Sequence, residues 1–422
     1  MFPPFWGMPP TTSAMLEQIQ RELGQMTERF DGTFRRLIGT HPVAVAQTPA
    51  EVVHTDNKLR VLRYQPVVER PHPVPLLIVP SLINRYYIFD LQPGKSMVEY
   101  LLSQGIDVYM IDWGEAGPED RFVTFDHYIT GYLRRIVQRV RTLSGQDRIS
   151  LLGYSVGGTL TAIFSTLYGQ YVRNLVQIAA PINFHDEGLL SQWTRKDRFN
   201  VDLIVDTLGN MPTELMRASF RMLKPTVQIA QQITLANKLG DTEAVQDFLA
   251  MQTWLNDHVV FPGEAYRKLI KECYQDNLLV QGRLVIQGKR VDLGQIEAPL
   301  LNIMAARDHL CPPQSSAVLN ELVRSADKQL LELPSGHVGI VAGRTASKQL
   351  WPQLANWLIG RSQAPTAVQT TVAPASATGP SIEPTVDLDV TASEAPAAPR
   401  PKKPRRRKST PSESPAPESG TT

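Results

Sequence analysis

The chain has 422 residues, of which 42% are hydrophobic and 20% are charged, and its formal net charge is +2. This composition is typical of a globular protein with a large core and excludes a chain that is disordered throughout. The small net charge excludes a uniform field that would draw the whole molecule to nucleic acid or to an anionic membrane.

The sequence contains no run of about 18 apolar residues, so we expect no transmembrane segment. Its first residues, MFPPFWGMPP, lack the basic region and the long apolar stretch of a secretory signal. Two cysteines are too few for a disulfide framework. These features predict a cytoplasmic protein.

Residues 1–40 are predicted to form an amphipathic helix. Its apolar residues recur every seven positions, at Leu16, Leu23, Phe30 and Leu37, with Ile19 and Met26 between them. A seam of this kind indicates packing against another helix. Two interpretations remain open, because the helix could pack on its own domain or dock a helical partner.

Between residues 41 and 362, short β-rich apolar runs alternate with helical patterns. The predicted strands are Leu59–Tyr64, Leu76–Pro80, Ile106–Ile111, Ile149–Tyr154, Leu175–Ala180, Leu300–Ala305 and Gln329–Leu333. The predicted helices between them include Lys95–Gln104, Phe125–Leu143, Gly157–Tyr168 and Ser315–Val323. Crossovers of this length allow parallel pairing, so the pattern predicts an α/β protein with a doubly wound, mostly parallel sheet.

The alternation is interrupted over residues 183–297, where helical patterns rich in Trp, Phe and Met separate two strands. We interpret this region as a helical cap inserted into the sheet, which divides the core into residues 41–182 and 298–362. The cap is expected to cover a mostly apolar pocket. Alternatively, its large side chains serve only to pack the cap against the sheet.

Residues 363–422 contain 11 of the 33 prolines and few large apolar residues, a composition that predicts a disordered tail. Within it, the segment from Arg400 to Lys408 is a compact basic cluster with acidic residues on both sides. Closely spaced Lys and Arg on a flexible chain predict weak, salt-dependent contact with nucleic acid. A solvated tail without a partner is the competing interpretation.

A turn that can carry a nucleophile follows the strand that begins at Ile149. Its sequence, Gly-Tyr-Ser-Val-Gly-Gly over residues 153–158, fits the G-x-S-x-G elbow, in which a serine sits on a strained turn between a strand and a helix. Small residues around the serine let strand and helix approach closely. Ser155 is therefore the predicted catalytic nucleophile, and a structural serine in a tight turn is the alternative.

A serine hydroxyl needs a base, and in this type of site the acid and then the histidine follow the serine along the chain. Asp308 follows the strand Leu300–Ala305, and His337 follows the last strand. Both are thus predicted at the carboxyl edge of the sheet, where open α/β sheets place their sites. His309 is a weaker candidate for the base, and Asp112 is expected to cap its own loop rather than to join the triad.

An oxyanion formed during acyl transfer needs backbone donors. One is expected from the amide of Val156, directly after the nucleophile, and one from the loop that follows an early strand. In that loop, residues 80–84, the sequence leaves open whether Leu82 or Ile83 supplies the second donor.

At these motifs the chain resembles the polyhydroxyalkanoate synthases, especially the shorter catalytic subunits of the two-component class III and IV enzymes. The similar stretches are Leu77–Arg85, Phe89–Gly94, Val108–Gly114, the elbow at Gly153–Gly158, Trp254–Asp257, Phe261–Tyr266, Asp308–Pro313 and Gly336–Gly339. They occur in one order over about three quarters of the chain. The resemblance implies an α/β-hydrolase fold with the helical cap.

The sequence departs from the family pattern at the nucleophile, where the family carries cysteine and this chain carries Ser155. A thiol is more readily activated by a neighbouring histidine, and it exchanges readily with a thioester. The serine therefore shifts the expectation toward ester hydrolysis. Cys311 lacks the elbow geometry that would let it replace the missing thiol, and Cys273 is expected to be a packing residue.

Three functions follow from these observations. The resemblance implies an acyltransferase that moves (R)-3-hydroxyacyl groups from coenzyme A, the expected thioester substrate, to a growing polyester, with no other cofactor. The serine favours a hydrolase with the same triad, namely a polyester depolymerase, esterase or thioesterase. The third is a non-catalytic protein on polyester granules, against which the retained triad argues. The resemblance also implies a helical second subunit or granule-associated protein as a partner for residues 1–40.

Overall fold

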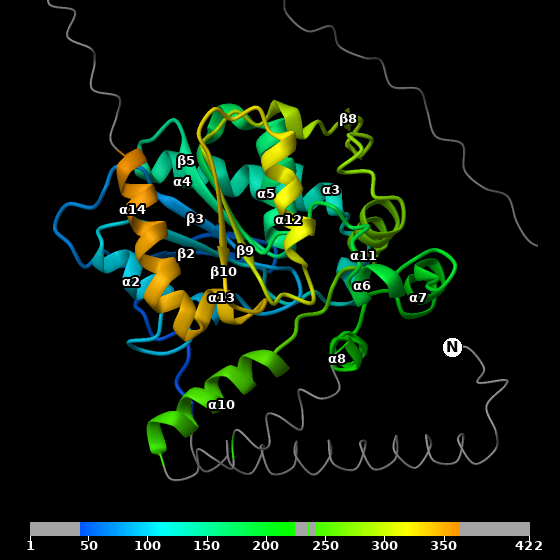
Figure 1. Cartoon of the computed structure of the whole chain (residues 1–422), viewed down its shortest axis with the longest axis horizontal. Helices are drawn as coiled ribbons and strands as arrows, with labels where there is room; N and C mark the ends of the chain where they lie inside the picture. The colour runs from blue at the N-terminus through cyan, green and yellow to red at the C-terminus, as the bar shows by residue number, and fades with distance from the viewer. Residues whose placement is uncertain (1–42, 224–234, 236–240, 363–422) are drawn as a thin grey trace, which may run out of the picture. The chain divides into compact units, whose positions relative to one another are not determined.

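The computed structural model describes residues 43–223, 235 and 241–362 (Figure 1). The amphipathic helix at residues 1–40 and the tail at 363–422, with its basic cluster, lie outside the described residues. Those two interpretations, and the partners attached to them, therefore stay predictions.

The described chain is built on an eight-stranded sheet with the order β1-β2-β4-β3-β5-β6-β9-β10. The strands are β1 (Ala50–Asp56), β2 (Leu59–Tyr64), β3 (Leu76–Val79), β4 (Val108–Asp112), β5 (Ile149–Tyr154), β6 (Val172–Ile178), β9 (Leu300–Ala305) and β10 (Lys328–Leu333). β2 pairs antiparallel with β1 and β4, and all the other pairs in this sheet are parallel. The chain passes from β3 to β4 on one side and then returns to β5 on the other, so the strand order reverses at β3. Loops that leave the carboxyl ends of β3 and β5 therefore meet at the switch point where such sheets place their sites.

Alternation of side chains along the central strands supplies both layers of the core. The helices of the two layers are α2 (Met97–Ser103), α3 (Phe125–His127), α4 (Arg134–Ser144), α5 (Val156–Leu167), α12 (Pro313–Leu322), α13 (Gly339–Ala342) and α14 (Trp351–Ser362), with π-helical turns at Tyr128–Leu133 and Ala346–Leu350. In β3, Leu77 and Val79 face a cluster formed with α4, α5 and α12, whereas Leu76 and Ile78 face a cluster formed with α2, α13 and α14. The prediction of a doubly wound, mostly parallel α/β sheet is confirmed.

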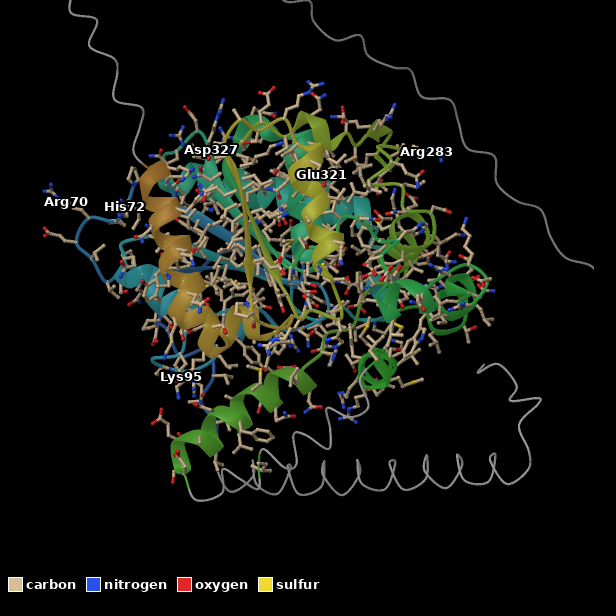
Figure 2. All side chains as sticks on the ribbon, in the orientation of Figure 1. Arg70, His72, Lys95, Arg283, Glu321 and Asp327 are labelled. Carbon is tan, nitrogen blue, oxygen red and sulfur yellow. The ribbon has the colours of Figure 1, made fainter. Side chains whose placement is uncertain are left out.

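Between β6 and β9 the chain leaves the sheet and forms the cap. Its elements are α6 (Leu189–Trp193), α7 (Val201–Leu208), α8 (Thr213–Leu223), α10 (Thr242–Asn256), α11 (Gly263–Lys268), a π-helical stretch (Leu269–Gln275) and the hairpin of β7 (Val285–Ile286) and β8 (Lys289–Arg290). Lys95, labelled in Figure 2, fastens α10 to the core: its Nζ lies 2.8 Å from Glu243 Oε1 and 2.6 Å from Asp247 Oδ2.

Candidate active site

Ser155 occupies a strained backbone conformation between β5 and α5, with φ 52° and ψ −129°. A positive φ is unfavourable for a residue with a side chain, and such strain persists only where the surrounding structure holds it. Here the N–H of Ser155 donates to the carbonyl of Ile178 over 3.0 Å, while its own carbonyl accepts from the N–H of Gly158 over 2.8 Å. The elbow expected from the sequence is therefore present in the geometry.

Two glycines let the elbow close against its neighbours. A Cβ on Gly157 would lie 2.2 Å from the carbonyl oxygen of Val79 at the end of β3. A Cβ on Gly153 would lie 2.2 Å from the hydroxyl oxygen of Thr161 in α5. Both separations are far below van der Waals contact, so only glycine allows α5 to begin this close to β3 and β5.

The three predicted triad residues come together at the carboxyl edge of the sheet. His337 Nε2 lies 3.1 Å from Ser155 Oγ, and His337 Nδ1 lies 2.6 Å from Asp308 Oδ2. The other carboxylate oxygen of Asp308 accepts from the backbone N–H groups of Leu310 and Cys311, over 2.8 and 2.9 Å. Asp308 and His337 are buried. This arrangement can take a proton from the serine hydroxyl and stabilise the imidazolium that forms.

Tyr154, the residue before Ser155, contacts His337 through both its hydroxyl and its ring. Its hydroxyl donates to the carbonyl of His337 over 3.1 Å, and the two rings lie 5.2 Å apart with an angle of 32° between their planes. Burial raises the pKa of the Tyr154 hydroxyl, so the hydroxyl stays protonated and remains a donor. Sequence reasoning missed this role because the position is a variable letter of the elbow pattern.

The weaker candidates, His309 and Asp112, do not join the contacts between Ser155, His337 and Asp308. His309 lines the same cavity as the triad, but the Asp308 carboxylate contacts His337. Asp112 accepts from Arg60 Nη2 over 2.6 Å and from the N–H of Gly114 over 3.0 Å, and thus orders its own loop.

The two cysteines are both buried. The Cys311 sulfur lies 3.3 Å from the hydroxyl oxygen of Ser316, and burial raises the pKa of its thiol. Cys273 packs in the core within the π-helical stretch of the cap, where burial also raises its pKa. A raised pKa disfavours the thiolate, so neither sulfur is an activated nucleophile.

The candidate oxyanion donors lie beside the elbow. Val156 begins α5, so its N–H has no partner four residues earlier in the helix. Of the two candidates in the loop after β3, Ile83 lines the cavity in front of Ser155, whereas the Leu82 side chain is buried in the core. The Ile83 N–H is held only by a long contact, 3.4 Å, to the hydroxyl oxygen of Ser81.

In front of Ser155 lies a cavity of about 500 Å³. The core supplies one wall through Ser155, His337 and the loop after β3, and the cap supplies the other through α6, α8, α10 and the segment that follows α10. The surface of the cavity is mostly apolar. The cap wall supplies the apolar residues Leu190, Phe220, Met251, Trp254 and Leu255 and the polar residues Arg217, Arg221, Gln252, Asn256 and His258. The volume suits an acyl chain or a short polyester segment.

Backbone pairing joins the cap to the loop after β3, residues 80–84, which holds the candidates for the second oxyanion donor and is called the oxyanion loop below. The N–H of Val259 donates to the carbonyl of Ile83 over 2.9 Å, and Asn84 forms an antiparallel bridge with His258. The cap segment after α10 thus lies against the oxyanion loop as a short strand would.

Side chains reinforce the same junction. Trp254 Nε1 donates to the carbonyl of Arg85 over 2.7 Å. The two carboxylate oxygens of Asp257 accept from Arg85 Nε over 3.1 Å and from the hydroxyl of Tyr87 over 2.7 Å. All four residues lie in or beside stretches that carry the family resemblance, but the sequence did not indicate that these stretches touch.

Within the described ranges, no group of three or more His, Cys, Asp or Glu side chains is arranged to hold a metal ion. Among the helices that the structure describes, none is long and apolar enough to cross a membrane.

Two family models match the chain. A family described as the N-terminus of poly-beta-hydroxybutyrate polymerase (PhaC) matches residues 11–101, and the alpha/beta hydrolase fold matches residues 74–343. Among solved structures, a monoacylglycerol lipase from Paleococcus ferrophilus is similar over 72% of this chain and 99% of its own, with 13% identity and a TM-score of 0.43.

Two curated relatives are much more similar in sequence. The poly(3-hydroxyalkanoate) polymerase subunit PhaC of Haloferax mediterranei is 38% identical over 84% of this chain and 73% of its own length. The subunit of the same name from Allochromatium vinosum is 38% identical over 82% of this chain and 96% of its own length. The chain therefore belongs to the family of poly(3-hydroxyalkanoate) polymerase PhaC subunits, on an α/β-hydrolase fold.

Proposed function

We propose that the protein is an acyltransferase of the polyhydroxyalkanoate synthase type, which moves (R)-3-hydroxyacyl groups from coenzyme A to a growing polyester through Ser155. The observation that carries the proposal is the series of contacts from Ser155 through His337 to Asp308. Ser155 and His337 line the cavity between the core and the cap. Membership of the polymerase family supports the choice of thioester substrate and polyester product.

In the first half-reaction, Ser155 Oγ attacks the thioester carbonyl while His337 Nε2 takes its proton. The carbonyl oxygen becomes an oxyanion, which the Val156 N–H and a donor of the loop after β3 are placed to stabilise. The tetrahedral intermediate then collapses, the carbon–sulfur bond breaks, and His337 returns the proton to the departing sulfur. Asp308 stabilises the imidazolium in between. The products are free coenzyme A and an acyl ester of Ser155.

In the second half-reaction, the hydroxyl of another 3-hydroxyacyl group attacks the serine ester. His337 takes the proton of that hydroxyl and passes it to Ser155 Oγ as the ester bond breaks. Each turnover forms one new ester bond and releases one thiol. Both steps use only the three side chains, backbone donors and the thioester, so the proposal includes no further cofactor.

The nucleophile itself favours a second candidate, hydrolysis. An oxygen ester on Ser155 is a less reactive acyl donor than a thioester, so transfer to a hydroxyl competes less well with attack by water. A depolymerase, esterase or thioesterase would use the same triad, with water in place of the second hydroxyl.

Incubation of the pure full-length protein with 3-hydroxybutyryl-coenzyme A separates the candidates. Free thiol reports on acylation of Ser155, and the acyl product reports on the acceptor. Polymer supports the synthase, whereas free 3-hydroxybutyrate without polymer supports the hydrolase. Absence of both thiol release and covalent labelling of Ser155 would contradict either.

Two variants sharpen this test. Ser155→Ala should lose thiol release by a factor on the order of 10⁶, because the covalent route is removed. Ser155→Cys should raise the ratio of polymer to free acid, because a thioester intermediate is the more reactive donor.

We also propose that the protein works in the cytoplasm at the surface of polyester granules, and that residues 1–40 dock a helical second subunit or granule-associated protein. Removal of residues 1–40 should leave the core folded and abolish co-purification with that partner. Unfolding of the core would contradict a docking role.

A further inference from the structure

Two polar atoms in the wall of the active-site cavity are buried and have no hydrogen-bond partner among the described residues. They are Nε of Arg217 and Nδ1 of His258. Arg217 lies on α8, and His258 lies on the cap segment that pairs with the oxyanion loop. Buried polar groups are almost always hydrogen-bonded in folded proteins, so these two atoms in one wall can pair with a polar group of a bound substrate.

Both aromatic and polar side chains surround these two residues. The ring of Phe220 lies 5.9 Å from the ring of His258, with 30° between their planes. Arg221, one helical turn after Arg217 and also in the cavity wall, donates through Nη2 to the side-chain oxygen of Asn256 over 3.2 Å. Of the polar cap residues that line the cavity, Arg217 and His258 are the two that have a buried atom without a partner among the described residues.

His258 is 8% exposed, and burial together with the neighbouring Arg217 lowers its pKa to about 4. It is neutral at physiological pH, and the nitrogens of a neutral imidazole are one donor and one acceptor. The Nε–H of Arg217 is a donor only. A hydroxyl group can pair with both atoms in either tautomer of His258, because its oxygen both accepts and donates a hydrogen bond.

We propose that Arg217 and His258 form a hydroxyl-binding subsite in the cap wall. The subsite selects acyl groups that have a hydroxyl on a carbon other than the carbonyl carbon. The hydroxyl oxygen accepts from Arg217 Nε, and the same hydroxyl pairs with Nδ1 of His258. An unsubstituted alkanoyl group leaves both atoms unpaired. The subsite rests on the proposed function, since it assigns to cap residues the recognition of the 3-hydroxyl group.

The test compares two thioesters, 3-hydroxybutyryl-coenzyme A and butyryl-coenzyme A, by the rate of thiol release in a single turnover of the full-length protein. This rate reports on acylation of Ser155 and does not depend on whether water or a hydroxyl accepts the acyl group later. A finding that the enzyme is a hydrolase would thus leave the subsite test intact. The quantity compared between variants is the second-order rate constant of thiol release for the hydroxylated substrate, divided by that for the plain substrate.

We expect that ratio to fall about tenfold in Arg217→Met and in His258→Phe, because a site with unpaired polar groups rejects the substrate that lacks the matching group. His258→Gln keeps a donor and an acceptor and should restore part of the ratio. Arg195→Met removes an exposed arginine of the cap that does not line the cavity, and it should leave the ratio at its wild-type value.

A ratio that stays within twofold of wild type in Arg217→Met would overturn the proposal. An equal loss of thiol release from both thioesters would overturn it as well. Arg217 is partly exposed, so its variant tests the subsite even if His258→Phe fails to fold. Preference for the plain substrate by the wild-type protein would also overturn it, whether or not polymer forms.

Discussion

The hydroxyl of Tyr154 donates to the backbone carbonyl of His337, and the two rings face each other at 5.2 Å. The residue before the nucleophile therefore fixes both the loop and the ring of the base. Because Tyr154 ends β5 and Ser155 follows it directly, the end of one strand positions both Ser155 and His337.

Tyr154→Phe should lower kcat about fivefold, because it removes one buried hydrogen bond and keeps the ring. Tyr154→Leu removes the ring as well and should lower kcat further, with a smaller change in KM, because the residue positions the base. Steady-state thiol release at saturating substrate measures both. Equal kcat values for Tyr154→Phe and Tyr154→Leu would show that the ring contact does not position His337.

Asp308→Asn should lower kcat by roughly 10³–10⁴, as loss of the carboxylate does in other serine enzymes. The asparagine cannot both accept from the two backbone amides and accept from His337 Nδ1, because one of its two groups is a donor. Asp186→Asn is the matched control, since Asp186 lies outside the triad and accepts from the N–H of Gly188. A kcat for Asp308→Asn within tenfold of wild type would remove this residue from the site.

Asp257→Asn should lower kcat about tenfold, because the two hydrogen bonds that it receives hold the cap against the oxyanion loop. The loss should shrink with a thionoester substrate, whose sulfur gains little from oxyanion donors. Glu115 is the other partner of Arg85, and it is exposed and belongs to the core. Glu115→Gln should therefore alter kcat less than twofold. If Asp257→Asn lowers kcat equally for an ester and for the matching thionoester, the effect lies outside the oxyanion hole.

The lowered pKa of His258, about 4 in the folded protein against 6.5 when unfolded, makes stability depend on pH. Between these values the unfolded state binds a proton that the folded state does not, so stability falls as the pH drops from about 6.5 toward 4. At pH 5 the loss from this residue is about 2 kcal/mol. Urea unfolding of wild type and His258→Gln at pH 7 and pH 5 measures this loss. The free energy of unfolding should fall by correspondingly less in the variant than in the wild type. His185→Gln, an exposed histidine, should behave as wild type.

The sheet was predictable because its central strands are buried on both faces and read as continuous apolar runs. β3 and β5 match their predicted runs to within one residue. β1 was missed because this edge strand is mostly exposed and carries polar residues among its valines. The hairpin of β7 and β8 was missed because two strands of two residues leave no periodic pattern.

The candidate site was predictable only where chain order carries information. Ser155, Asp308 and His337 each follow a strand at its carboxyl end, and the geometry brings them together. Arg217 and His258 could not be found in this way, because they come from a helix and a loop of the cap whose distance from Ser155 along the chain says nothing about their distance in space.

The strain at Ser155 lies in its backbone dihedrals and depends on the glycines around it, not on the atom at the end of its side chain. Oxygen and sulfur at this position would therefore sit on the same scaffold. A single-base change converts some serine codons into cysteine codons, so one mutational step would exchange the reacting atom without repacking the core.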